Sequence, residues 1–169
     1  MALQRGDQIL VDTNVIIEAH RVGCWRGMAS EFRLITVEKV VEETQTGHQN
    51  RAEEQHIDQA TLREQLDQVA AVSRSQLAAI DLDYPAHGLD AGEHHLVAFA
   101  RTMEEPAWLL NSPDKGTIRF CGESDWLERL ISLEAMANAL GMPHAGRLRG
   151  NHREEWLRRQ VNQFRFGLS

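Results

Sequence analysis

The sequence predicts an α/β fold: a three-layer sandwich with a short, mostly parallel central sheet flanked by helices. Short apolar runs that are typical of buried strands alternate along the chain with longer segments of helical character. The apolar residues of these runs are continuous rather than alternating, as in strands whose two faces are both covered. The chain of 169 residues is long enough to bury a substantial core in one domain.

The first part of the chain contains two predicted strands, each followed by a helix. Residues 9–11 predict a strand, and residues 14–20 predict the helix after it. Residues 34–35 predict a second strand. Thr36 is then expected to cap the helix that carries "VEKVVEETQ", and Gly47 is expected to end it.

The middle of the chain is predicted to be largely helical. Residues 51–79 are rich in Ala, Gln, Glu and Leu without Gly or Pro, so they predict one long helix or two that break near Ser73. The segment "AIDLDYP" is expected to hold a brief strand. Asp90 has the position of an N-cap for the helix in "LDAGEHHLVAFARTMEE", which Pro106 is expected to end.

The last predicted elements follow residue 106. "AWLLN" predicts another short buried strand. Ser112, Pro113 and Asp114 come in the order of a helix start, with a cap, a proline at the first position and an acid in the first turn. "RLISLEAMANALG" predicts a small strand and a helix that Gly141 and Pro143 end.

The bulk composition bounds the class of protein. The net charge of −7 argues against a protein that coats nucleic acid, but not against an enzyme that reaches phosphate through metal ions. No apolar stretch approaches the roughly 20 residues that a membrane helix needs. Residues 1–6 lack the features of a secretory signal, and Cys24 and Cys121 suit neither a disulfide framework nor a zinc spacing. We therefore expect a cytoplasmic protein without membrane contact.

Four acidic residues fall where a ligand would bind such a sheet. Asp12 and Asp114 each follow a predicted strand, Glu93 lies in the first turn of a helix, and Glu43 lies within one. Ligands of parallel sheets bind beyond the carboxyl ends of the strands, so the four carboxylates could converge there. Crowded carboxylates raise one another's pKa unless a cation is present, and Mg²⁺ or Mn²⁺ prefers oxygen ligands. The pattern therefore favours a metal site.

Each acid also has a structural explanation. Asp12 could cap the next helix, Asp90 and Glu93 have the spacing of a capping box, and Asp114 could serve a helix dipole. Glu43 could belong to a solvated helix face. These roles do not jointly account for acids after two buried strands and a third in mid-helix, so the metal site is the preferred interpretation.

Two other classes of enzyme fit the sequence less well. Glu93, His94 and His95 suggest zinc, but neighbouring residues on a helix point about 100° apart and cannot easily chelate one ion. A haloacid-dehalogenase-type phosphatase needs a second Asp two residues after the first, and Asn14 occupies that position.

Four stretches of the chain resemble, in the same order, the acidic motifs of PIN-domain nucleases. They are "ILVDTNVII", "VVEET", "LDAGEHHLVAFA" and "WLLNSPD", and the resemblance spans residues 8–121. The strand followed by Asp-Thr-Asn and the Gly-Glu followed by an apolar helix are both characteristic of that family. In the second motif Glu42 and Glu43 are adjacent, and Glu43 matches the family pattern.

The resemblance implies a PIN-like fold and metal-dependent hydrolysis of RNA phosphodiester bonds. The catalytic and metal-binding residues that it implies, for Mg²⁺ or Mn²⁺, are Asp12, Glu43, Glu93 and Asp114. Asn14 and Ser112 match the polar positions that steady the first and last acids. Asp12 is then expected to lie exposed at the sheet edge, with its charge met by metal.

Many PIN proteins are toxins of toxin–antitoxin pairs, so the resemblance also implies an antitoxin protein and a homodimer as candidate partners beside the RNA substrate. The stretch of residues 47–79 and the basic C-terminus exceed what a compact toxin needs. The alternative is a catalytically silent PIN-like scaffold that binds RNA or a protein partner.

The C-terminal segment differs in composition from the rest of the chain. Residues 1–146 would form the PIN-like nuclease domain, and residues 147–169 an Arg-rich helical tail packed on it. Arg158 and Arg165 share a helix face and are candidate substrate-binding residues. The alternative is that the arginines of the tail pair with the protein's own acids, such as the neighbouring Glu154 and Glu155.

Overall fold

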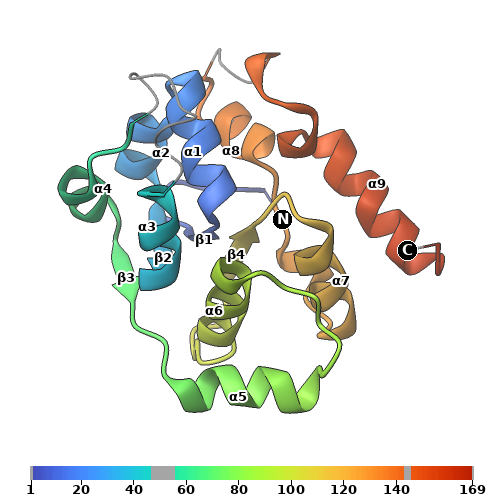
Figure 1. Cartoon of the computed structure of the whole chain (residues 1–169). Helices are drawn as coiled ribbons and strands as arrows, with labels where there is room; N and C mark the ends of the chain where they lie inside the picture. Colours follow the sequence, from blue (N-terminus) through green and yellow to red (C-terminus); the bar gives the residue numbers. More distant parts are fainter. Residues whose placement is uncertain (1, 47–55, 143–145, 169) are drawn as a thin grey trace.

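The computed structural model describes residues 2–46, 56–142 and 146–168. In this part of the chain four parallel strands form one sheet in the order β3-β2-β1-β4, with helices packed around it (Figure 1). The strands are β1 (Gln8–Val11), β2 (Arg33–Val37), β3 (Gln68–Ala70) and β4 (Trp108–Asn111). The α/β class with a parallel sheet is thus confirmed, and the arrangement is compatible with a three-layer sandwich.

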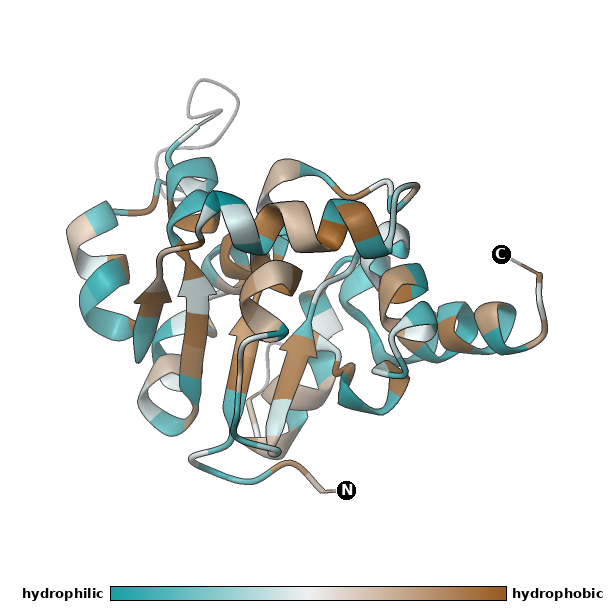
Figure 2. Cartoon of the chain, turned by 90° about the horizontal axis from the view of Figure 1, so that it is seen from below, coloured by the Kyte–Doolittle hydropathy of each residue, from teal (hydrophilic) through white to brown (hydrophobic). Residues whose placement is uncertain are grey.

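The helices surround a sheet whose strands are largely apolar (Figure 2). Strand β1 lies at the centre of the core, and its residues 9–11 are fully buried. The α-helices of the described residues are α1 (Thr13–Val22), α2 (Trp25–Glu31), α3 (Glu38–Thr44), α4 (Gln59–Gln65), α5 (Arg74–Asp83), α6 (Ala91–Ala100), α7 (Lys115–Glu123), α8 (Leu133–Ala139) and α9 (Glu154–Arg165).

Side chains define where several helices begin. Ser73 forms a capping box with Gln76 at the start of α5, so a helix does begin at the predicted break. Asp90 caps α6 in the same way, with Glu93 as its partner, which confirms the predicted N-cap. The helix ends at Ala100, earlier than the predicted stop at Pro106.

Two predicted N-caps are wrong. Thr36 lies inside β2, fully buried, where its hydroxyl donates to the carbonyl oxygen of Val11 at 2.7 Å, and α3 begins only after Val37. At the other site the cap is Asp114 rather than Ser112. The Oδ1 atom of Asp114 accepts hydrogen bonds from the backbone of the first turn of α7, which the hydroxyl of Ser112 does not do.

Three predictions of secondary structure are also wrong. Residues 59–79 do not form uninterrupted helix, because β3 lies between α4 and α5 and pairs with β2. The segment "AIDLDYP" belongs mostly to the C-terminal part of α5. The small strand expected before α8 is only an isolated bridge between Leu110 and Leu130. The predicted stops at Gly47 and Pro143, and residues 51–55 of the predicted helix, lie outside the described residues.

The Arg-rich tail contacts the domain through helix α9, which packs against α7 and α8 (Figure 1). The chain leading into α9 is held by Glu18, a buried acid of α1 that accepts two hydrogen bonds from Arg21 at 2.6 and 2.8 Å. The backbone N–H of Arg149 donates to the same carboxylate at 2.8 Å. The tail is therefore attached to α1 through a buried charged group.

No helix of the described ranges is both long and apolar enough to cross a membrane.

Candidate functional site

The candidate site lies beyond the carboxyl ends of β1 and β4, the point where the order of the sheet reverses. The chain passes from β1 to β2 on one side, whereas β4 pairs with β1 on the other. A crevice at such a switch point is where open parallel sheets bind ligands. Asp12 follows β1 directly, and its backbone N–H donates to the carbonyl oxygen of Asn111 at the end of β4 at 3.2 Å. The two strand ends are thus adjacent.

Asp12 is buried at these strand ends, so the expectation of an exposed Asp12 is wrong. Its exposed fraction is 2%, because strand ends and the first turns of nearby helices surround it. It occupies the N-cap position of α1 without a side-chain capping bond, and Ser112 Oγ lies 3.4 Å from its Oδ2 atom. Burial raises the pKa of Asp12 to about 7, and the charges of Asp90, Glu43 and Asp114 add to the rise.

Glu93 is a second buried acid, held at the start of α6. Its Oε2 atom accepts from the backbone N–H of Asp90 at 3.1 Å, and Asp90 Oδ1 accepts from the backbone N–H of Glu93 at 2.9 Å. Its exposed fraction is 3%. Burial raises the pKa of Glu93 to about 9, followed in size by the effects of Asp114, Asp90 and Asp12. Glu93 therefore does form a capping box with Asp90, but these hydrogen bonds do not offset the effects of burial and of the neighbouring carboxylates on its pKa.

Glu43 faces this group of acids and its neighbour Glu42 does not, as the prediction required. Thr13 Oγ1 donates to Glu43 Oε2 at 2.7 Å, whereas Glu42 is exposed and pairs with Lys39 at 3.0 Å. The carboxylate of Glu43 also occupies space that any side chain at Gly92 would need. A Cβ atom there would lie 2.3 Å from Glu43 Oε2, so glycine lets α3 and α6 approach.

Asp114 completes the predicted set from the start of α7. Its Oδ1 atom accepts from the backbone N–H groups of Gly116 at 2.6 Å and Thr117 at 3.3 Å. Asp114 is therefore an N-cap as well as a charged neighbour of Asp12 and Glu93. The hydroxyl of Thr117 is buried one turn into this helix and has no hydrogen-bond partner in the described part of the chain.

Of the predicted supporting and substrate-binding residues, some lie where they were expected and others do not. Ser112 contacts the first acid, Asp12, as predicted, whereas Asn14 is exposed on the first turn of α1. Arg165 pairs with Glu128, and Arg158 lies along a separate depression of α9. Of the two candidate substrate-binding arginines, Arg165 thus follows the alternative of pairing with the protein's own acids.

The prediction missed the contributions of Asp90 and Thr13. Asp90 was interpreted only as a cap, yet its charge raises the pKa of both buried acids. The signal was present, because a capping-box residue lies within one turn of its partner at position 93. Thr13 gave no such signal, since its bond to Glu43 joins residues 30 positions apart in sequence.

A hard divalent cation fits this donor set. All the groups are oxygen ligands, and no Lys or Arg forms an ion pair with Asp12, Glu43, Glu93 or Asp114 in the described residues. Burial raises the pKa values of the two buried acids, and the charges of the neighbouring carboxylates raise them further. Cations of this class bind through a few carboxylates plus water, so the residues present are chemically suited to Mg²⁺ or Mn²⁺.

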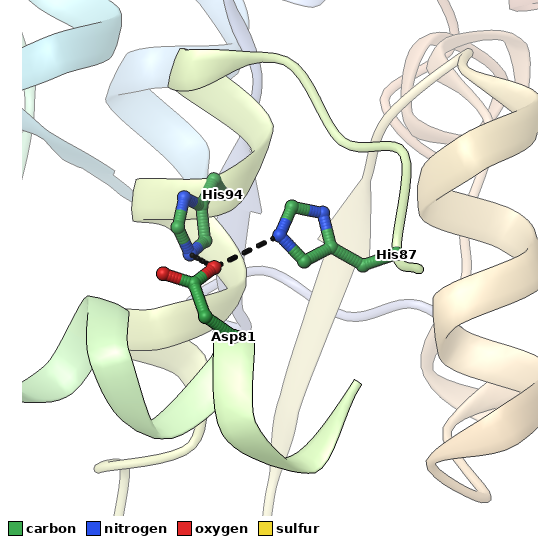
Figure 3. A group of neighbouring side chains, drawn as sticks. All are labelled: Asp81, His87 and His94. Atoms are coloured by element: carbon green, nitrogen blue, oxygen red, sulfur yellow. Dashed lines mark hydrogen bonds and ion pairs between the residues drawn. The ribbon is translucent and has the colours of Figure 1, made fainter. Parts of the chain in front are cut away.

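A second group of metal-ligand side chains comes from α5, from the loop that follows it and from α6 (Figure 3). Asp81 Oδ1 lies 3.0 Å from His87 Nε2 and 3.1 Å from His94 Nε2. Within the described ranges it is the one set of three or more such residues whose ligand atoms all lie within 4.8 Å of one another. The oxygens of the four predicted acids are therefore spread more widely.

The protons of this trio oppose metal binding. The backbone N–H of Leu89 donates to His87 Nδ1 at 2.9 Å, so the proton of the neutral ring sits on Nε2, which donates to Asp81. His94 Nε2 lies 3.1 Å from Asp81 Oδ1 and 3.3 Å from the carbonyl oxygen of Leu77. A metal needs the nitrogen lone pair. The trio is a hydrogen-bonded link between α5, the following loop and α6.

Comparison of the chain with models of protein families, with curated proteins and with solved structures finds no match in any of the three.

Proposed function

We propose that this chain is a PIN-like, Mg²⁺- or Mn²⁺-dependent ribonuclease that hydrolyses phosphodiester bonds of RNA. The observation that carries the proposal is the pair of buried acids, Asp12 and Glu93, at the switch point of the sheet with three further carboxylates around them. A fold that needed these acids only as helix caps would have no reason to bury two of them without a compensating cation. The order of the motifs along the chain supports the same family.

The proposed ligands are held by different means. Thr13 orients Glu43, the capping box orients Glu93, and the first turn of α7 orients Asp114. These bonds fix the carboxylates before a ligand arrives, which lowers the entropy lost on binding. A bound ion would neutralise charge that builds on the phosphodiester and lower the pKa of a water for attack.

Asp12 has the central role in this proposal. It is the most enclosed of the acids and contacts the ends of both central strands through its backbone and through Ser112. Replacement by Asn keeps the shape and removes the charge. The Asp12→Asn variant is therefore expected to fold and to lose metal-dependent cleavage.

A scaffold without activity is the second candidate function. It is favoured by the capping bonds of Glu93 and Asp114, which give both acids a structural role whether or not metal binds. In that case the chain would bind RNA or a protein partner and would gain no stability from Mn²⁺. The roles of toxin and of antitoxin partner remain predictions from the resemblance.

The test compares wild type, Asp12→Asn and a matched surface control, Asp67→Asn. Asp67 is an acid outside the site that pairs with Arg33. Each protein is incubated with labelled single-stranded RNA in Mn²⁺ or in chelator, and its melting temperature is measured in both. Wild type and control should cut RNA and melt higher in Mn²⁺, and Asp12→Asn should do neither. Equal cleavage by Asp12→Asn and wild type would refute the site.

A further inference from the structure

A polar cavity with a volume of about 620 Å³ lies between α7 and α9. Asp114 contributes to its wall, so the cavity adjoins the candidate site directly. The two helices meet where Phe164 of α9 lies over Gly122 of α7, and a Cβ atom at that glycine would be 2.3 Å from the ring. The cavity lies on the N-terminal side of this contact along α7, the side of the acids.

The α7 wall of the cavity carries two cationic side chains next to the carboxylate of Asp114. Lys115 and Arg119 are four residues apart on α7, so they share a helix face, and both are exposed. Neither forms an ion pair with an acid in the described part of the chain, although the protein has a net charge of −7. Arg119 donates instead to the carbonyl oxygen of His87 at 3.1 Å, which holds its guanidinium beside the cavity.

The α9 wall is polar and uncharged. Gln160 and Gln163 line it from successive turns, and their side-chain amides have no hydrogen-bond partner among the residues that the structure describes. Each amide offers donors and an acceptor. Phe164 adds part of an aromatic ring to the same wall. Cations on one side and free amides on the other are the groups that contact phosphates and base or sugar edges.

We infer that this cavity holds the substrate strand next to the acids, and that its ligand is single-stranded RNA. The inference rests on the proposed function and names the groups that would hold its substrate. A polyanion must be drawn toward a negative site, and Lys115 and Arg119 supply positive charge within reach of Asp114. A cavity of this volume is the size of a small-molecule pocket, too narrow for a duplex. The free amides can contact the 2′-hydroxyl, which distinguishes RNA from DNA.

The test measures binding rather than cleavage. Fluorescein-labelled single-stranded RNA, the same DNA strand and an RNA duplex are titrated with full-length protein in chelator at several salt concentrations. Wild type should prefer single-stranded RNA. Each phosphate contact contributes a slope of roughly 0.7 in log affinity against log salt, so Lys115→Gln with Arg119→Gln should flatten the slope by about 1.4.

Two further double variants locate the binding surface. Gln160→Ala with Gln163→Ala should lower the affinity about 5- to 140-fold without changing the slope, since each of the two lost hydrogen bonds is worth about 0.5–1.5 kcal/mol and tenfold is about 1.4. The matched control, Arg26→Gln with Arg74→Gln, removes two charges from exposed arginines that do not line this cavity and should leave the slope unchanged.

Three outcomes would overturn the inference: no detectable RNA binding by wild type, an unchanged slope in the α7 variant, or equal binding of duplex. A flattened slope only in the control with Arg26 and Arg74 changed would place the binding surface away from this cavity, against the inference. Cleavage measured in parallel in Mn²⁺ separates the two proposals. Cleavage with an unaltered slope refutes the cavity alone, whereas binding without cleavage refutes the nuclease alone.

Discussion

The substitution Asp12→Asn should stabilise the metal-free protein, and more so as the pH rises. Burial raises the pKa of Asp12 from 3.8 to about 7, so the folded state keeps a proton that the unfolded state has already lost. The free energy of unfolding therefore falls as the pH rises from about 4 to about 7, and is constant above that as far as this group is concerned. An amide does not ionise, so the variant escapes this loss.

The magnitude follows from the two pKa values. Each pH unit between pH 5 and the folded pKa costs the wild type about 1.4 kcal/mol, so the gap between variant and wild type should widen by about 3 kcal/mol from pH 5 to pH 8. For a chain of this size that corresponds to a relative rise of about 6–12 °C in melting temperature. Ser112 can donate to the new amide oxygen, which limits any loss of hydrogen bonding.

Urea unfolding in chelator at pH 5 and pH 8 measures the gap directly. Asp67→Asn serves as the control, because Asp67 is a partly exposed surface acid and its substitution should give the same offset at both pH values. A gap for Asp12→Asn that is equal at pH 5 and pH 8 would refute the electrostatic reasoning. So would a wild type whose stability does not fall over this range.

Three further substitutions test the surroundings of the site. Glu93→Gln keeps an oxygen that can accept from the N–H of Asp90, so α6 should stay intact. Because one charge is removed, the melting temperature in chelator should rise and the further rise on adding Mn²⁺ should be smaller than in the wild type. An unchanged rise with Mn²⁺ would show that Glu93 is only a helix cap. Gly92→Ala should push the carboxylate of Glu43 aside, because its Cβ atom would lie 2.3 Å from Glu43 Oε2, so the gain in melting temperature from Mn²⁺ should fall; an unchanged gain would show that the position of this carboxylate does not matter for metal binding. Asp81→Asn should lower the free energy of unfolding by about 1 kcal/mol, because the hydrogen bonds to both histidines are weakened. Co²⁺ added to the wild type should give no ligand-field band from this trio. A band that is present in the wild type and absent in Asp81→Asn would establish a metal site there.

The strands that were predicted correctly are those whose own residues bury apolar surface, whereas the strands expected in "AIDLDYP" and before α8 did not form. Strands β1 and β4 were predictable because a continuous apolar run suits only a covered strand, and the acid after each run was placed by the geometry of the sheet. Strand β3 was not predictable. Its three residues, Gln68–Ala70, lie at the edge of the sheet and are strand only because β2 pairs with them, while the surrounding composition favours helix.

The sequence indicated which residues form the candidate site better than it indicated how deeply they are buried. Motif and spacing selected Glu43 over Glu42, and the structure turns Glu43 toward Asp12. The burial of Asp12 could not be predicted, because it depends on how closely the first turns of separate helices approach one another. The wrong cap at Thr36 has the same origin: a hydroxyl that suits a helix start locally is bonded across the sheet to Val11.

The candidate site and the adjoining cavity draw on different parts of the chain. The acids of the candidate site all precede residue 115, whereas the α9 wall of the adjoining cavity is held in place by the buried anchor at Glu18 and by Phe164 over Gly122. Substitutions on the cavity face of α9 therefore leave every acid and its supporting bond untouched. If both proposals hold, substitutions in α9 can change which RNA the protein binds and leave the residues that hydrolyse it unchanged.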